Sequence, residues 1–122
     1  MIRSKFNGSV LEINTDDGIR RIDLGHEIGN ILTTTEENVI VRFELVGSAT
    51  PERNIMSLDK YGNTVWRVED PGMWRVGREI WPTDHFGGMG FDEKGDLWAS
   101  GGESRYRIDS KTGKILEEIY TK

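Results

Sequence analysis

Acidic and glycine-rich stretches mark the places where this chain could hold a metal or a phosphate. Residues 14–18, "NTDDG", begin like a calcium loop with oxygen ligands at alternate positions, but Leu24 and Gly25 stand where that loop needs a bidentate Glu. Residues 87–90, "GGMG", contain the glycines of a phosphate loop, but no Lys-Ser or Lys-Thr pair follows them. We therefore interpret the first stretch as a hairpin turn and the second as close backbone packing on an inner strand.

Side chains for acid, base or nucleophilic catalysis are few and scattered. The chain has no Cys, which excludes disulfides and thiolate metal ligands, and its two His residues are His26 and His85. Either could act as an isolated base, but a His in a loop is more often solvated or hydrogen-bonded. The Ser residues lie in no nucleophile-elbow motif. We therefore predict a chain that is not an enzyme and has no catalytic residue.

These residues lie between short alternating strands whose pattern repeats along the chain. Residues 10–24, 55–69 and 106–119 each contain an apolar strand, a polar residue, a turn with Gly and a second strand. The polar residue can bond backbone amides two positions further on, and the Gly relieves a left-handed turn. In chain order the polar residue and the Gly are Asn14 with Gly18, Asp59 with Gly62, and Asp109 with Gly113.

A second type of hairpin precedes the two later copies, over 31–46 and 89–100. Asn38 and Gly95 are its expected turn residues, because Asn and Gly tolerate positive φ best. Each full unit then has two hairpins, and its length matches the roughly 40 to 50 residues of one propeller blade. The sequence thus predicts one all-β domain over 1–122, an antiparallel meander of about eleven short strands. Its expected parts are a partial blade at 1–24, a blade at 30–69, an insertion loop at 70–87 and a blade at 88–120.

Three stretches carry a family resemblance. "ERNIMSLDKYGNTVWRVED" and "RYRIDSKTGKILEEIY" resemble the repeats of quinoprotein-type β-propellers, and "GMGFDEKGDLWAS" resembles the inner hairpin of gluconolactonase-like and NHL-repeat propellers. The resemblance implies an incomplete, propeller-like array of three sheets. It implies a fold and not a function, because one fold supports many activities. A β-sandwich built from the same hairpins is the alternative.

The resemblance also implies sites that this chain does not reproduce. Quinoprotein enzymes bind a quinone cofactor and calcium, but no segment here matches their active-site motif. Lactonase-like relatives hold a metal at the propeller axis, whereas Asp92, Glu93 and Asp96 share one expected hairpin turn. We therefore predict no metal and no cofactor. Propellers close with four to eight blades, so three blades leave a wedge that stays open, pairs with a second chain or is covered by a partner.

The repeat does not explain the stretch 70–87, "DPGMWRVGREIWPTDHFG". It holds Trp74 and Trp81, and long loops in compact domains are often functional. Because Trp and Arg are enriched at binding hot spots, we predict a partner-binding loop; the alternative is an apolar plug of the wedge. Trp66 and Trp98 lie on regular strands and are predicted to pack between sheets. The candidate partner-binding residues of the loop are Asp70, Trp74, Arg75, Arg78, Trp81, Asp84 and His85.

The charge of the chain bears on its partners. The net charge of −5, from 21 acidic and 16 basic residues, argues against nucleic acid and favours a basic protein, although ordinary solubility charge explains it as well. No apolar run approaches the roughly 20 residues of a membrane span, and no leader segment is seen. We therefore expect a cytoplasmic chain without membrane contact. A salt-laced surface is favoured over nucleic-acid contact for the basic cluster of Arg75, Arg78, Arg105 and Arg107.

Size, charge and loops together predict a non-catalytic module that binds another protein. By analogy of size and charge, the chain is similar to bacterial immunity proteins and inhibitors, which neutralise a toxin such as a basic nuclease. The acidic loop residues expected to steer such a partner are Asp16, Asp17, Glu36 and Glu37. The alternative is a hydrolase or sugar-binding protein with a metal at the axis of a propeller that a homodimer completes.

Overall fold

The described residues of the computed structural model, 2–44, 53–69, 85–101 and 104–120, form eleven strands and no helix. Every strand pairing is antiparallel, and the strands form three separate sheets in which neighbours in space are neighbours in sequence. None of the sheets closes into a barrel. The predicted all-β meander of three sheets is therefore confirmed.

The three sheets follow one another along the chain. Sheet A consists of β1 (Arg3–Asn7), β2 (Val10–Thr15) and β3 (Gly18–Asp23). Sheet B consists of β4 (Ile28–Thr33), β5 (Val39–Phe43), β6 (Ile55–Leu58) and β7 (Thr64–Arg67). Sheet C consists of β8 (Phe86–Phe91), β9 (Leu97–Gly101), β10 (Ser104–Ile108) and β11 (Ile115–Tyr120). Sheets B and C each begin two residues before the predicted blades at 30–69 and 88–120.

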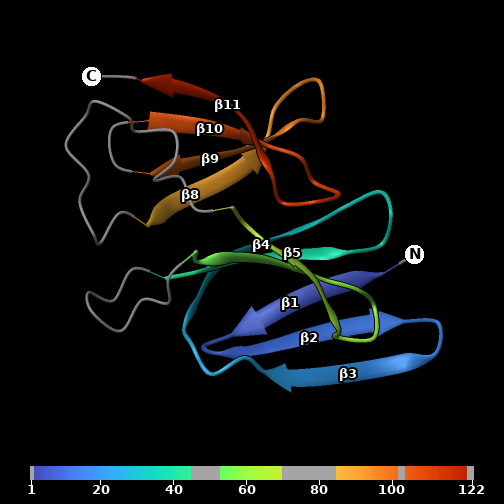
Figure 1. The fold of residues 1–122 in the computed structure, drawn as a ribbon. Helices are drawn as coiled ribbons and strands as arrows, with labels where there is room; N and C mark the ends of the chain where they lie inside the picture. Colours follow the sequence, from blue (N-terminus) through green and yellow to red (C-terminus); the bar gives the residue numbers. More distant parts are fainter. Residues whose placement is uncertain (1, 45–52, 70–84, 102–103, 121–122) are drawn as a thin grey trace.

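The three sheets lie closest to one another at their first strands, β1, β4 and β8. Strand β1 lies beside β4, and β4 lies beside β8, so that sheet B is the middle layer between sheets A and C (Figure 1). The tight turns that join β2 to β3, β4 to β5, β6 to β7, β8 to β9 and β10 to β11 all lie at one end of the molecule (Figure 1). We call this end the turn end.

Two hydrophobic cores lie on the two faces of sheet B. The continuous apolar run of β5 is buried on both sides, because its alternate residues point to different neighbouring sheets. Val39 and Val41 pack toward sheet A, whereas Ile40 packs toward sheet C. The core between A and B includes Leu11, Ile13, Met56 and Leu58, and the core between B and C includes Ile55, Trp66, Phe86, Leu97, Tyr106 and Ile108.

Polar side chains shape the turns as the sequence predicts in most places. Asp59 Oδ1 accepts hydrogen bonds from the backbone N–H groups of Tyr61 and Asn63, and Asp109 Oδ1 accepts one from Lys111. In sheet A the corresponding acceptor is Thr15 and not Asn14, because β2 runs one residue further than predicted.

The prediction for the β4–β5 turn was wrong in its detail. Glu37, with a φ of 64°, takes the left-handed position that was expected of Asn38. Asn38 instead bonds through its backbone N–H to Thr34 Oγ1. The other predicted turn residue, Gly95, does have a positive φ, of 82°.

The β6–β7 and β10–β11 hairpins each pack a turn glycine on the preceding sheet. The Gly62 turn lies on Ile22 of sheet A, and the Gly113 turn lies on Trp66 of sheet B. Trp66 also donates a hydrogen bond from Nε1 to the Ser110 carbonyl at 2.9 Å. These contacts repeat with the sheets and hold each sheet against the one before it.

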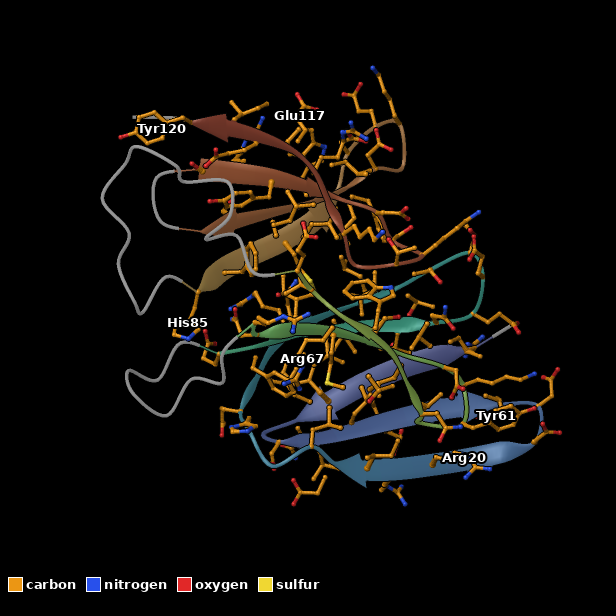
Figure 2. The ribbon with its side chains drawn as sticks, in the orientation of Figure 1. Arg20, Tyr61, Arg67, His85, Glu117 and Tyr120 are labelled. Atoms are coloured by element: carbon orange, nitrogen blue, oxygen red, sulfur yellow. The ribbon has the colours of Figure 1, made fainter. Side chains whose placement is uncertain are left out.

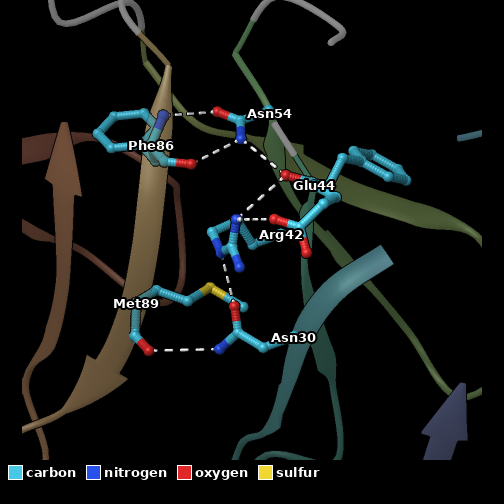
Figure 3. Close-up of polar contacts among 7 residues, drawn as sticks. Asn30, Arg42, Glu44, Asn54, Phe86 and Met89 are labelled. Atoms are coloured by element: carbon cyan, nitrogen blue, oxygen red, sulfur yellow. Dashed lines mark hydrogen bonds and ion pairs between the residues drawn. The ribbon is translucent and has the colours of Figure 1, made fainter. Parts of the chain in front are cut away.

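Buried amides join sheet B to β8 (Figure 3). The fully buried Asn54 accepts a hydrogen bond from the Phe86 N–H at 2.8 Å and donates one to the Phe86 carbonyl, also at 2.8 Å. Asn30 donates to the Met89 carbonyl and accepts from Arg42 Nε at 2.7 Å. Because buried polar groups must be satisfied, these bonds fix the position of β8 on sheet B.

Candidate functional site

The outer face of sheet C differs from the faces between sheets. The turns of sheets B and C match, and β4 and β8 have β-bulges at the same place, so each residue of sheet B can be aligned with one residue of sheet C. Sheet B presents an apolar surface to sheet C, whereas sheet C presents a mixed aromatic and charged surface to solvent. The equivalent pairs are Ile40 and Trp98, Ile55 and Arg105, Ser57 and Arg107, and Trp66 and Glu117.

A depression of about 460 Å³ lies on this outer face, along β8 and β9. It is lined by Gly88, Met89, Gly90, Phe91, Asp92, Trp98, Ser100 and Arg105. No atom lies within 4 Å of the point where a Cβ would stand at Gly88 or Gly90. The prediction of close backbone packing at 87–90 is therefore wrong at these two glycines, which leave space above the sheet. We call this depression the Trp98 groove.

Two neighbours hold the Trp98 ring in place. Its Nε1 donates a hydrogen bond of 2.8 Å to Asp92 Oδ2, and the Arg105 guanidinium lies 5.0 Å from the ring centroid. The hydrogen bond from Trp98, followed by backbone bonds from Asp96 and Lys94, keeps the pKa of the Asp92 carboxyl below its ordinary value of 3.8. The aromatic surface of the groove is thus oriented before any ligand arrives.

An ion pair borders the groove on the same face. Arg107 Nε lies 3.0 Å from Glu117 Oε1, and both side chains are partly exposed. Arg107 of the predicted basic cluster is thus ion-paired, whereas Arg75 and Arg78 lie outside the described residues and the prediction for them stays a prediction. The outer face of sheet C therefore combines a fixed aromatic ring, two Arg side chains and a depression.

The comparisons with known proteins place the chain in one family. The model of a domain of unknown function, DUF7957, matches residues 1–120 and so spans all three sheets. The chain belongs to this family. No curated protein and no solved structure matches it.

The four acidic residues predicted to steer a partner lie in two turns of this DUF7957 domain. Asp16 and Asp17 form the β2–β3 turn, and Glu36 and Glu37 lie in the β4–β5 turn. Both turns belong to the turn end (Figure 1). The Glu36 carboxylate lies 3.6 Å from Lys111 Nζ, which partly offsets its charge.

The structure does not bring His85 together with these acidic residues. His85 precedes β8 at the end of the molecule opposite to the turn end, as its position relative to Tyr61 shows (Figure 2). The other predicted loop residues, Asp70, Trp74, Arg75, Arg78, Trp81 and Asp84, lie outside the described residues. The choice between a binding loop and a plug therefore stays a prediction.

The remaining polar candidates do not gather into a reaction centre. His26 packs its ring against Phe43, with the centroids 5.4 Å apart. The described part of the chain contains no group of three His, Asp or Glu side chains placed to hold a metal ion. The same part has no helix that is long and apolar enough to cross a membrane.

Sequence reasoning missed Trp98 and Arg105 as site residues. Trp66 is buried between sheets as predicted, but Trp98 lies on the outer face of the last sheet. The repeat alignment contained a signal, because Arg105 stands where the preceding unit has Ile55 and Glu117 where it has Trp66. Charges at positions that are apolar in the preceding repeat mark the sheet at which the stack ends.

Proposed function

We propose that this chain is a non-catalytic protein-binding module whose main binding surface is the outer face of sheet C around the Trp98 groove. The observation that carries the proposal is the replacement of an apolar inter-sheet surface by Trp98, Arg105 and Arg107 around an open depression. Trp and Arg are the residue types most enriched where a few side chains dominate binding energy. A fixed Trp ring also loses little conformational entropy on binding.

The kind of partner follows from charge, and a basic protein is the proposed one. The chain carries a net charge of −5 and has acidic residues in the turns of the turn end. Phe91 and Asp92, which line the Trp98 groove, lie at this same end. Acidic turns would attract a basic partner and orient it toward the groove, which raises the association rate more than the final affinity.

The finer proposal is an immunity protein or inhibitor that neutralises a basic toxin such as a nuclease. It is supported by the size and acidity of the chain and by an aromatic face on which Asp92 and Arg105 contact the Trp98 ring. The propeller-type relationship is supported in turn by two four-stranded meander sheets with bulges at equivalent positions. The alternative of a metal-bearing propeller completed by a homodimer gains no such support, because both end faces of the stack carry charged side chains.

Affinity capture with matched variants tests the proposal. The immobilised chain is incubated with lysate of its own cells, and retained proteins are compared among the unaltered chain, Trp98→Ala, Arg105→Ala and Tyr61→Ala. Tyr61 is the control, because it is an exposed aromatic residue on a different turn. We expect one basic protein to be retained stoichiometrically, and its retention to fall at least tenfold with Trp98→Ala but not with Tyr61→Ala.

Equal retention by all four proteins would place the interface elsewhere and contradict the proposal. With the captured partner purified, the association rate measured at low and moderate salt tests the acidic steering. We expect this rate to fall several-fold as salt rises. An unchanged rate would contradict the acidic steering but would not contradict binding at the Trp98 groove.

A further inference from the structure

Sheet A has a free edge at the place where sheets B and C each have a strand. In sheet B, β4 covers the edge of β5, and in sheet C, β8 covers the edge of β9. Strand β1 is the equivalent of β5 and β9, because β2 and β3 match β6 and β7 through their turns. No strand among the described residues pairs with the second edge of β1.

The register shows which backbone groups this edge offers. Asn7 stands opposite Val10 across a turn of two residues, so the β1–β2 ladder closes with a hydrogen-bonded pair there. Hydrogen-bonded pairs alternate along the ladder, and the N–H and C=O groups of Ser4 and Phe6 therefore point away from β2. Within the described residues, Arg3–Asn7 make no backbone hydrogen bond to another sheet. Strand β4 lies beside β1, however: the Gly8 carbonyl, directly after β1, accepts a hydrogen bond from the Ile28 N–H at 2.9 Å, and Ser4 Oγ lies 3.0 Å from Thr33 Oγ1.

The side chains along this edge favour one kind of occupant. Arg3 and Lys5 lie on the outward face of sheet A and are exposed, with 77% of the Lys5 side chain accessible. Lys5 Nζ lies 3.3 Å from Glu12 Oε2, so Glu12 offsets part of its charge. Phe6 points to the other face and is 39% exposed, whereas its equivalents Arg42 and Ser100 have the neighbouring strands β4 and β8 beside them. A strand beside β1 would meet positive charge on one face and an uncovered aromatic ring on the other.

We infer that the free edge of β1 binds an extended acidic segment of a partner protein as a fourth strand of sheet A. Backbone hydrogen bonds to Ser4 and Phe6 supply affinity, and alternate side chains supply selectivity. Acidic residues face Arg3 and Lys5, and apolar residues cover Phe6. The inference does not rest on the proposed function, since it uses a different sheet and a different partner charge.

A second copy of this chain fits the edge poorly. Antiparallel pairing of two β1 edges would bring Arg3 and Lys5 of one chain close to the same residues of the other, and like charges opposite one another destabilise a sheet. Exposed Lys on an edge strand is also a known protection against self-pairing. The same charges attract an acidic strand.

A peptide titration tests this inference. The probe is a capped, fluorescent peptide of about eight residues in which Glu and Val alternate, and its control has Lys in place of Glu. Binding is followed by fluorescence anisotropy, and amide exchange of the full chain by NMR. We expect the Glu peptide to bind more tightly than the Lys peptide and to protect the Ser4 and Phe6 amides, which exchange freely without it.

Charge reversal on β1 provides the matched variant. The double variant Arg3→Glu with Lys5→Glu keeps the backbone edge, and we expect it to weaken binding of the Glu peptide about tenfold. The control double variant Lys60→Glu with Lys94→Glu makes the same charge change in turns and leaves binding unchanged. Circular dichroism verifies that both variants fold.

Three results would overturn the inference. They are no binding of the Glu peptide, equal binding of both peptides, or binding without protection of the Ser4 and Phe6 amides. If the chain alone has twice its monomer mass and these amides are protected in it, the occupant is a second copy and the acidic partner is wrong.

Discussion

The two end faces of the three-sheet stack are built differently. On the outer face of sheet A, Lys5 and Arg21 both lie close to Glu12, at 3.3 and 3.0 Å, and close this face with ion pairs. On the outer face of sheet C, the ion pair between Arg107 and Glu117 lies beside an open groove with Trp98 in its wall. Ion pairs thus cover the outer face of sheet A, whereas the outer face of sheet C leaves an aromatic side chain accessible.

Comparing equivalent positions of the three sheets shows which apolar residues are replaced by polar ones on the outer face of sheet A. In sheet B the residues that pack on sheet A are Val39, Val41, Met56 and Leu58, and in sheet C their equivalents are Leu97, Ala99, Tyr106 and Ile108. In sheet A the equivalents are Arg3, Lys5, Glu12 and Asn14. Polar residues at the terminal positions of a repeat array end its growth and keep it soluble. We infer that sheets A and C both end the stack, and that the outer face of sheet C also leaves a surface for a partner.

The largest expected effect comes from exchanging an interior residue with its end-face equivalent. Ile55→Arg buries a charge between sheets B and C without a partner, which costs several kcal/mol of a total stability of about 5–15 kcal/mol, and we expect the chain to unfold. The reverse change Arg105→Ile on the outer face should alter the free energy of unfolding by less than about 1 kcal/mol. Urea denaturation followed by circular dichroism measures both. Similar costs for the two changes would contradict the assignment of interior and end face.

The next effect compares a turn glycine that packs on a sheet with one that does not. A Cβ at Gly113 would lie 2.6 Å from Trp66 Cε3, whereas a Cβ at Gly95 would meet no atom within 4 Å. The φ angles, 79° and 82°, are nearly equal, so backbone strain cancels in the comparison. We expect Gly95→Ala to cost about 1 kcal/mol and Gly113→Ala about 3 kcal/mol, because the second adds overpacking. Thermal unfolding of the two variants checks this, and equal melting temperatures would refute the packed turn.

A smaller effect is expected on the outer face of sheet A. Glu12→Met introduces the residue type that sheet B has at the equivalent Met56, and it removes the carboxylate between Lys5 and Arg21. The two cations are largely exposed, although only 15% of the Glu12 side chain is accessible. Ion pairs with exposed partners contribute little, so the free energy of unfolding should fall by less than about 1 kcal/mol. Chemical denaturation measures this change, and light scattering reports self-association. A loss above about 3 kcal/mol would mean that the outer face of sheet A is buried in the folded chain.

The smallest effect concerns the groove and depends on pH. The pKa of Asp92 is lowered in the folded chain, so its contribution to stability is present above the ordinary carboxyl pKa and is lost as the pH falls through the folded value. Asp92→Asn removes the ionised acceptor of Trp98 Nε1. We expect the variant to be less stable than the unaltered chain near pH 7, and the difference to shrink as the pH falls below the ordinary carboxyl pKa and through the lowered value of Asp92. A difference that does not depend on pH would contradict this role of the carboxylate.

Local turn chemistry explains how much of the fold the sequence predicts. Asp59 and Asp109, each followed by a Gly, locate their hairpins because the side chain and the turn satisfy one another within five residues. In sheet A the predicted turn acceptor was Asn14, whereas the structure has Thr15. The sequence did not separate the two, because Thr and Asn can both cap a turn. Glu37 in a left-handed conformation breaks local preference, and no single-sequence rule selects it over Asn38.

The candidate site was harder to predict because it depends on where the stack ends. A Trp on a regular strand packs between sheets when another sheet follows, as Trp66 does, and faces solvent when none follows, as Trp98 does. The free edge of β1 was not predicted for the same reason, since among the described residues sheet A has no strand equivalent to β4 and β8. Such features belong to the arrangement of sheets and not to any one hairpin.

The solution mass of the chain alone, measured by light scattering, tests the central claim that both end faces stop the stack. We expect a single species of 13.9 kDa over the whole concentration range, because charged side chains occupy the positions that would join a second copy. A stable species of twice that mass would contradict it. That result would show that the end faces join, and it would favour the propeller completed by a homodimer over the monomeric binding module.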